Sequence, residues 1–263
     1  MKQKVKAKVL SQKCLSTGIY DLWIKTNLAR EASSGQFIGI YTDDASKLLP
    51  RPISICEVSD SKDALRMVYR VTAPSSGTDK LSTLKEGDEI SIIGILGTGY
   101  ANIIKELKNE KVLLLGGGIG IPPMLQTAKE LCENNIKPIV IAGYRDSNLF
   151  LNQDLAKYGD LKIASEDGSV GTRGNVLNVV DGFDIKADVI MACGPMPMLK
   201  AIKKYASDNN IKAYISLEER MACGVGACLG CVCRTKEVDG HSHVKNARIC
   251  TDGPVFNAED VDI

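Results

Sequence analysis

The chain has 263 residues, 44% of them hydrophobic, and its 33 basic and 32 acidic residues give a formal net charge of +1. This length predicts two or three compact units, and the balanced charge without a basic run argues against nucleic acid or an anionic membrane as partners. The basic N-terminal segment leads into no apolar signal region, no stretch approaches the ~18 apolar residues of a membrane span, and the nine cysteines are an odd number, so we expect reduced thiols in the cytoplasm.

From residue 1 to about 98, short apolar runs alternate with turn residues. Such spacing predicts an antiparallel β-barrel or sandwich, which we place in a first domain at residues 1–100. The six expected strands are 5–9, 19–25, 36–41, 53–58, 65–71 and 89–94.

From about residue 110 the pattern changes to alternating strands and helices. Lys111–Leu115 is a continuous apolar run, as expected for a strand buried on both faces of a parallel sheet. Apolar residues at helical spacing then predict a helix over about Pro122–Asn134. The alternation continues with strands at 139–142 and 188–192 and a helix around Leu199–Tyr205. We therefore expect a doubly wound nucleotide-binding domain at residues 101–215.

A glycine-rich turn joins the first of these strands to its helix. Glycines there permit a sharp turn and close approach of a pyrophosphate, and the helix presents free N–H groups to it. The candidate residues are Gly116, Gly117, Gly118 and Gly120. Proline stands where G-x-G-x-x-G has its last glycine, and a plain glycine-rich turn is the alternative.

A second candidate nucleotide motif is Cys193-Gly194-Pro195, which follows the 188–192 strand. Open α/β sheets bind ligands at the carboxyl edge of their strands, so Cys193 is placed to line a nicotinamide site. A buried structural thiol is the alternative.

The barrel also carries candidate phosphate contacts. Arg51-Pro52-Ile53-Ser54 opens a strand, and it offers a guanidinium for a phosphate oxygen pair and a hydroxyl for a ring nitrogen or carbonyl. Gly77 and Thr78 begin a short helix whose N-terminus can hold a second phosphate contact. The alternatives to phosphate contacts are that Arg51 is an exposed arginine of a strand and that Thr78 is an ordinary N-cap.

The last part of the chain is dominated by cysteines. Cys223, Cys228 and Cys231 are followed by Cys250, which is the C-x4-C-x2-C…C spacing of plant-type [2Fe-2S] proteins. We place a cluster domain at residues 216–263, which has too little apolar periodicity to fold without the cluster.

Three alternatives to this ligand set exist. A structural zinc site also uses four thiolates but usually pairs two C-x2-4-C knuckles. Cys233 competes with Cys250 as fourth ligand, although residues at i and i+2 of an extended segment point to opposite sides. His241 and His243 offer Rieske-type nitrogen ligands, but Rieske centres use another spacing. The remaining cysteines, Cys14, Cys56 and Cys132, are expected to pack as small hydrophobes.

Together these motifs resemble the ferredoxin-reductase superfamily over residues 1 to about 210. With the cysteine loop and Cys250–Phe256, the whole chain resembles the electron-transfer subunits of type B dihydroorotate dehydrogenase. The resemblance implies cluster ligation by the four cysteines named above, and FAD contacts through Arg51, Pro52, Ile53, Ser54, Tyr69, Arg70, Val71, Gly77 and Thr78. Ile53 stands where many relatives of the superfamily carry an aromatic residue.

The function implied by this resemblance is electron transfer. A cluster passes single electrons and a nicotinamide accepts a hydride, so a flavin must stand between them. The family uses a separate FMN-containing catalytic subunit for dihydroorotate and passes the electrons through the cluster and FAD to NAD+. We expect a heterotetramer with two of each subunit, and no catalytic base on this chain. The alternatives are the small subunit of an NADH-dependent ferredoxin:NADP or sulfide reductase, and a redox sensor without turnover.

Overall fold

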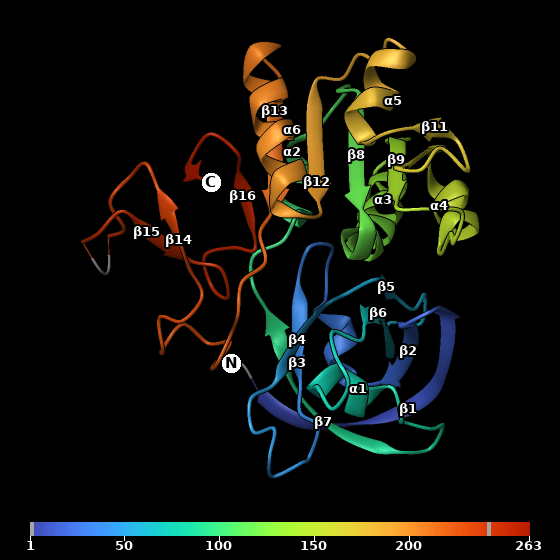
Figure 1. Cartoon of the computed structure of the whole chain (residues 1–263). Coiled ribbons are helices and arrows are strands. Elements are labelled where there is room, and N and C mark those ends of the chain that lie inside the picture. Colours follow the sequence, from blue (N-terminus) through green and yellow to red (C-terminus); the bar gives the residue numbers. More distant parts are fainter. Residues whose placement is uncertain (1–2, 241–242) are drawn as a thin grey trace.

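The computed structural model describes residues 3–240 and 243–263. It places an antiparallel sheet, a parallel sheet and a small C-terminal sheet one after another along the chain (Figure 1). The antiparallel strands are β1 (Gln3–Ser16), β2 (Ile19–Lys25), β3 (Phe37–Ile40), β4 (Arg51–Ser54), β5 (Glu57–Val58), β6 (Ala64–Arg70) and β7 (Glu89–Leu96), with helices η1 (Asn27–Arg30) and α1 (Gly77–Leu81) in the connections.

The first sheet is a curled, partly open barrel with strand order β4-β3-β7-β1-β2-β6-β5. Alternate residues of paired strands, such as Leu22 on β2 and Met67 on β6, are fully buried inside it. The curl brings β4 close to β6 although the two are not hydrogen-bonded. The predicted antiparallel barrel is confirmed, but the expected strand at 53–58 is two strands, because the chain leaves β4 after Ser54 and pairs with β6 only at β5.

One cysteine prediction in this sheet is wrong. Cys56 is buried and Cys132 is partly buried, but Cys14 is exposed on β1. β7 pairs with β1 only as far as Lys8, so the second half of β1 pairs with β2 alone. Side chains stand on the two faces of a sheet, and Cys14 lies on a face that this part of β1 leaves in solvent, where its Sγ donates to the carbonyl of Ser16 at 3.1 Å.

The second sheet has the order β11-β10-β9-β8-β12-β13-β16 and is parallel except for β16. Its elements are α2 (Ala101–Glu106), β8 (Val112–Gly117), η2 (Gly118–Gly120), α3 (Ile121–Glu133), β9 (Ile139–Tyr144), α4 (Asn152–Tyr158), β10 (Asp160–Ser165), β11 (Thr172–Arg173), α5 (Val176–Gly182), β12 (Val189–Cys193), α6 (Met196–Asp208) and β13 (Lys212–Ser216). The expected doubly wound fold is confirmed, and α3 begins and ends within one residue of its predicted bounds.

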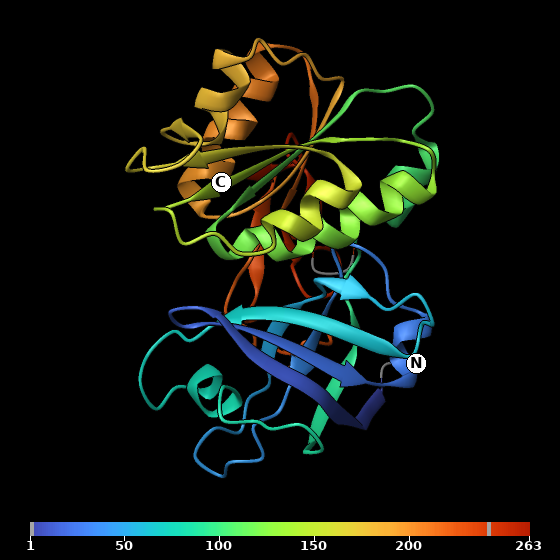
Figure 2. The ribbon, with the colours of Figure 1, turned by 90° about the vertical axis from the view of Figure 1, so that its right-hand side faces the viewer.

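The apolar run of β8 is buried on both faces of this sheet. Leu114 belongs to the core shared with α3 and α4, and Leu113 and Leu115 belong to the core shared with α5 and α6. Figure 2 shows the two helix layers on opposite sides of the sheet. Both layers leave the carboxyl ends of β8 and β12 facing the barrel.

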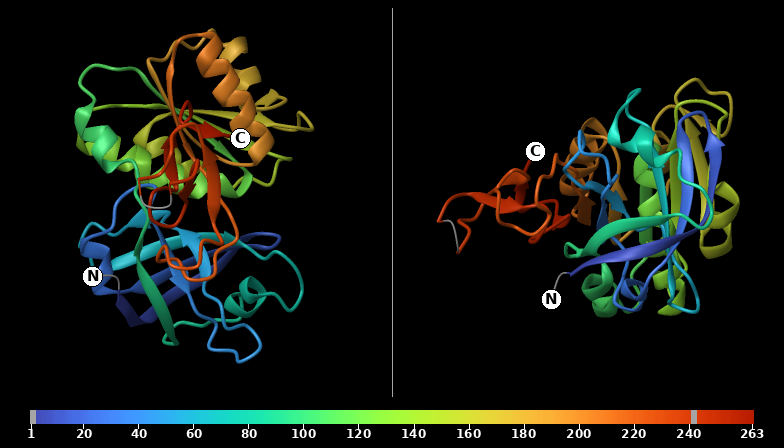
Figure 3. Two further views of the ribbon diagram at one scale, coloured as in Figure 1. Left: turned by 90° about the vertical axis from the view of Figure 1, so that its left-hand side faces the viewer. Right: turned by 90° about the horizontal axis from the view of Figure 1, so that it is seen from below.

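The C-terminal part packs beside the second sheet (Figure 3). Its strands are β14 (Val232–Thr235), β15 (Asn246–Arg248), β16 (Val255–Asn257) and β17 (Val261–Asp262). β14 pairs with β15 and β17, while β16 extends the second sheet by pairing with β13. Cys231, Ile249 and Cys250 are buried in the same core as Leu199 and Ile202 of α6. Within the described residues, we find no helix that is both long and apolar enough to cross a membrane.

A buried arginine joins the barrel to the second sheet. The Arg66 guanidinium donates to both carboxylate oxygens of Asp21, and its Nη1 donates to Glu57 and to Asp154 of α4, each at 3.0 Å. Removing one partner of a buried charge network leaves the other charges uncompensated. We therefore expect Arg66→Met to lower the free energy of unfolding by about 3–5 kcal/mol, measured by denaturant titration of Trp23 fluorescence.

The control for this prediction is an exposed ion pair. Lys25 and Asp63 lie 3.6 Å apart with 61% and 44% of their side chains exposed. Exposed pairs of this kind contribute about 0–1 kcal/mol, so Lys25→Met should scarcely change the unfolding midpoint. An equal loss in both variants would contradict the special role given to Arg66.

Candidate functional site

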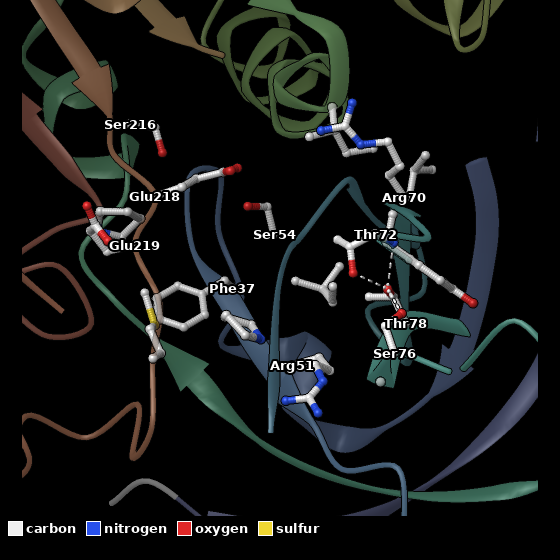
Figure 4. A pocket seen from close by; sticks show the side chains of 18 of the residues that line it. Phe37, Arg51, Ser54, Arg70, Thr72, Ser76, Thr78, Ser216, Glu218 and Glu219 are labelled. Carbon is white, nitrogen blue, oxygen red and sulfur yellow. Dashed lines mark hydrogen bonds between the residues drawn. The ribbon is translucent and has the colours of Figure 1, made fainter. Parts of the chain in front are cut away.

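The main cavity of the protein has a volume of about 570 Å³ and opens where the barrel meets the second sheet. Figure 4 shows its polar side chains directed inward from β4, β6, α1 and the segment after β13. It is lined by Phe37, Lys47, Arg51, Pro52, Ile53, Ser54, Val68, Tyr69, Arg70, Thr72, Ser75, Ser76, Gly77, Thr78, Ile119, Ser216, Leu217, Glu218, Glu219, Met221 and Pro254.

Arg51 and Gly77 form one wall of this cavity together. A Cβ atom on Gly77 would lie 1.8 Å from Nε of Arg51, so only glycine lets this arginine lie across the start of α1. Arg51 Nη1 donates to the carbonyl of Leu49 at 3.1 Å, and its other donors remain available to an anion. This wall suits the phosphates of a dinucleotide.

The N-cap of α1 is Ser76, so the alternative that Thr78 is an ordinary N-cap does not hold. Ser76 Oγ accepts from the Asp79 N–H at 3.1 Å, while Thr78 Oγ1 accepts from the Thr72 N–H at 3.1 Å. Thr78 therefore ties the end of β6 to α1. Both side chains still line the cavity.

The β6 candidates are placed differently from one another. The Tyr69 side chain is buried, and its hydroxyl donates to Gln12 at 2.8 Å. Arg70 is exposed at the cavity, and Figure 4 shows it above Thr72. Val71 does not line the cavity, and its N–H donates to the carbonyl of Gly18.

The two nucleotide motifs lie against each other. A Cβ on Gly120 would lie 2.3 Å from the carbonyl oxygen of Cys193, and a Cβ on Gly194 would lie 3.2 Å from the Gly117 nitrogen. The glycine turn and the Cys193–Pro195 turn thus form one surface at the carboxyl edge of the sheet. Of the turn residues only Ile119 reaches the main cavity, so this surface adjoins the cavity without being part of it.

Cys193 itself is fully buried at the end of β12. Burial raises the pKa of its thiol, and the nearby Glu218 carboxylate raises it further, although a hydrogen bond with Ser216 acts in the opposite direction. The thiol is therefore neutral at physiological pH. Cys193 contributes packing and polarity to the site rather than a thiolate.

The cavity wall formed by Ser216–Met221 was not predicted from the sequence. Glu218 projects toward Ser54 across the cavity (Figure 4). Burial raises the pKa of Glu218, and Arg70 partly opposes this rise. This wall follows β13, which ends at Ser216 on the carboxyl edge of the sheet, where open α/β folds bind ligands. Recognising β13 would have predicted the wall, but Lys212–Ser216 has too few apolar residues to be recognised as a strand from the sequence.

The cysteine loop forms a second centre. The Val225 N–H donates to Cys223 Sγ and the Gly230 N–H to Cys228 Sγ, each at 3.4 Å. Partial burial raises the pKa of the Cys223 thiol, but the backbone N–H groups of Val225, Cys228 and Ala227 and the Cys228 side chain outweigh it and lower that pKa to about 6. N–H groups aimed at sulfur favour thiolate, the form that binds metal.

The four cysteines are arranged as two pairs. Cys223 shares a hydrogen bond with Cys228, and Cys231 shares one with Cys250. Two irons that each take two thiolates require this pairing. Across residues 3–240 and 243–263, no three His, Cys, Asp or Glu side chains are grouped as ligands of one metal ion. The all-thiolate donor set, arranged in two pairs, fits a two-iron cluster.

Two of the other candidate ligands, Cys233 and His243, lie within the described residues. Cys233 is on β14 opposite Ala247, and burial raises the pKa of its thiol. His243 is exposed on the loop between β14 and β15. His241 lies outside the described residues.

The cysteine loop and the main cavity are physically continuous. Met221, two residues before Cys223, and Pro254, four residues after Cys250, both line the cavity. The barrel holds this junction through Thr98, whose N–H donates to the carbonyl of Gly253 at 2.6 Å. A cluster bound by the loop would thus lie a few residues from anything bound in the cavity.

Comparison with known proteins gives consistent matches over the whole chain. Residues 218–262 match the family model described as the iron-sulfur cluster binding domain of dihydroorotate dehydrogenase B. The electron transfer subunit of dihydroorotate dehydrogenase B (NAD(+)) from Streptococcus mutans is 38% identical over 94% of both chains. The subunit of the same name from Bacillus cereus is 40% identical over 97% of both chains.

Solved structures share the fold. The structure of an NADH-dependent reduced ferredoxin-NADP oxidoreductase superposes with a TM-score of 0.84 at 27% identity, over 97% of this chain and 89% of that one. A ferredoxin NADP+ reductase from Neisseria gonorrhoeae with bound FAD and NADP has a TM-score of 0.67 at 16% identity, over 82% of this chain and 94% of that one. The second match supports the architecture alone.

Proposed function

The chain belongs to the family of electron transfer subunits of NAD(+)-linked dihydroorotate dehydrogenase B, and we propose that it passes electrons from a separate FMN-containing, dihydroorotate-oxidising subunit to NAD+ in pyrimidine biosynthesis. The observation that carries this proposal is that the barrel, the second sheet and the cysteine loop all line one cavity. The barrel contributes Arg51 and Ser54, the second sheet contributes Ile119, and the cysteine loop contributes Met221.

The residues fit the implied cofactors. The packing of Arg51 on Gly77 supports the proposal that they hold the phosphates of FAD, and the position of Ser54 in the cavity lining supports a proposed hydrogen bond to its ring. Bound FAD accepts single electrons from an iron–sulfur cluster and exchanges a hydride with NAD+. The proposed contact sets are Arg51, Pro52, Ile53, Ser54, Tyr69, Arg70, Val71, Gly77 and Thr78 for FAD, Gly116, Gly117, Gly118, Gly120, Cys193, Gly194 and Pro195 for NAD, and Cys223, Cys228, Cys231 and Cys250 for the cluster.

We propose domains at 1–100, 101–215 and 216–263, with the last boundary at the end of β13. We propose two copies of each subunit in the complex, and the cytoplasmic location stays a prediction from cysteine usage. The alternative, a subunit of an NADH-dependent ferredoxin:NADP reductase, is supported by the TM-score of 0.84. The higher identity of the dihydroorotate dehydrogenase subunits, 38% and 40%, favours the first assignment.

The direct test is the content and redox behaviour of the purified chain. We expect one FAD and two irons per chain, with both chromophores bleached anaerobically by NADH. A chain without flavin, or one whose flavin NADH leaves oxidised, would refute the proposal.

The choice of nicotinamide is a further prediction. Arg145 and Asp146 follow β9, where the adenosine ribose is expected, and Glu166 and Asp167 follow β10 beside them. The Asp167 N–H donates to the Arg145 carbonyl at 3.3 Å, which keeps the β10 turn next to Arg145. Three carboxylates, those of Asp146, Glu166 and Asp167, thus stand beside Arg145 and the neighbouring Arg173, which pairs with Ser165. A 2′-phosphate would be repelled here, so we expect kcat/KM for NADH to exceed that for NADPH at least about tenfold, which corresponds to ~1.4 kcal/mol. Equal values would favour the ferredoxin:NADP reductase alternative.

A further inference from the structure

Helix α3 carries three polar side chains on the side that faces the barrel. Gln126, Lys129 and Glu130 are spaced three and four residues apart, so they share one face of the helix. Gln126 is 4% exposed and Lys129 is 7% exposed. A lysine this deeply buried has a cost in desolvation, which apolar packing at the same place would avoid.

All three side chains bond to the barrel. Gln126 accepts from the Val58 N–H at 2.8 Å, and Lys129 Nζ donates to the Val58 carbonyl at 3.0 Å. Lys129 also forms an ion pair with Asp60. The Glu130 carboxylate accepts from the N–H and hydroxyl of Ser34 at 2.7 and 2.6 Å. We call Ser34, Val58, Asp60, Gln126, Lys129 and Glu130 the polar seam.

The barrel side of the seam is close to the proposed flavin contacts. Val58 lies on β5, four residues after Ser54, and Ser34 lies three residues before Phe37 of the cavity wall. The carbonyl of Ser34 also accepts from the N–H of Tyr100, whose hydroxyl donates to the Ala192 carbonyl beside Cys193. The seam therefore joins the flavin wall to the nucleotide edge.

The other end of α3 begins at the glycine turn. The helix starts at Ile121, directly after Gly120, so its first turn and the proposed pyrophosphate contacts are one continuous structure. A helix of 13 residues moves as a unit. If α3 shifted at Gln126–Glu130, the glycine turn at its other end would move relative to the cavity.

We propose that Gln126, Lys129 and Glu130 are positioning residues that fix the nucleotide site at the distance from the flavin that hydride transfer requires. This rests on the proposed function. The hydrogen bonds of the polar seam are directional, so they hold α3 in one position along β5. A purely apolar contact would let the helix slide along the strand. Misplacement of reacting groups by about 1 Å can slow a reaction about a hundredfold.

The test compares Glu130→Gln with Glu133→Gln on the holoprotein. Glu133 is exposed on the same helix, and within the described part of the chain it forms no hydrogen bond or ion pair with the polar seam, so it is the matched control. We expect Glu130→Gln to slow flavin bleaching by saturating NADH about tenfold or more, with unchanged FAD and iron content and unchanged bleaching by dithionite. Glu133→Gln should stay within about twofold of the natural protein. Lys129→Met, compared with Lys204→Met at the exposed Lys204 of α6, gives an independent pair.

Amide hydrogen exchange gives a readout besides activity. We expect faster exchange at Gly116–Gly120 in Glu130→Gln and Lys129→Met, and no change in the two controls. Variants that bleach at the natural rate, or that lose FAD in proportion to their lost rate, would overturn the positioning role. If NADH fails to bleach even the natural protein, the proposed function fails, while the exchange comparison still decides whether the seam holds the turn.

Discussion

Cys250→Ser is expected to abolish the visible [2Fe-2S] absorbance, whereas Cys233→Ser should retain it. Cys250 is buried and hydrogen-bonded with Cys231, which gives the second iron its pair of thiolates. Cys233 belongs to β14 and pairs with Ala247, and an i, i+2 neighbour of Cys231 in a strand points to the other side. The absorbance and iron content of the anaerobically purified variants measure this.

Cys14→Ser is the control for thiol loss in general, because Cys14 is exposed on the barrel far along the chain from the loop. It should leave iron content and FAD unchanged. Since metal-binding free energy is also folding free energy, Cys250→Ser should in addition lower the melting temperature of the C-terminal part. Retained absorbance in Cys250→Ser with loss in Cys233→Ser would reverse the ligand assignment.

The isolated chain is expected to oxidise NADH with an artificial dye but not to oxidise dihydroorotate. The contacts proposed in its cavity are with FAD, and we assign the base for dihydroorotate oxidation to the partner subunit. Electrons must then enter through the cysteine loop from a partner. Leu229, with 55% of its surface exposed, and Val232, with 37%, are apolar residues on the outside of this loop, as expected at a docking surface.

Leu229→Glu is therefore expected to abolish dihydroorotate-dependent NAD+ reduction in the reconstituted complex and to leave NADH–dye activity nearly intact. A charge desolvated at the centre of an apolar interface typically costs several kcal/mol, of the order of a thousandfold in affinity. Leu48→Glu is the matched control, since Leu48 is 75% exposed on the barrel. Dihydroorotate turnover by the isolated chain, or equal coupling in both variants, would contradict this division of labour.

The elements with a local signal were predictable from the sequence. Lys111–Leu115 and the helix after it carry apolar residues at the period of a buried strand and an amphipathic helix, and the structure contains both. Strands β10 and β13 were not predicted, because they carry polar residues such as Lys162 and Lys212 and lack a continuous apolar run. Tertiary pairing with β9 and β12 makes them strands.

The same distinction holds for the site. Arg51 and Gly77 are recognisable because a phosphate contact needs a guanidinium or free backbone, and the structure packs one on the other. Glu218 and Met221 lie in a connection with no periodicity, and they reach the cavity only because β13 ends beside it. Such residues depend on how two sheets meet, which no local pattern encodes.

The pairing of β16 with β13 determines how the cysteine loop is attached. Ser216, where the chain leaves the second sheet, is directly opposite Val255, where the chain returns to it. The segment between them therefore begins and ends at one place on the sheet. Beyond β16, β17 pairs with β14 of this same segment. The part of the chain that carries the four cysteines is thus tied to the second sheet at both ends, so a cluster bound there would keep a fixed position relative to the cavity.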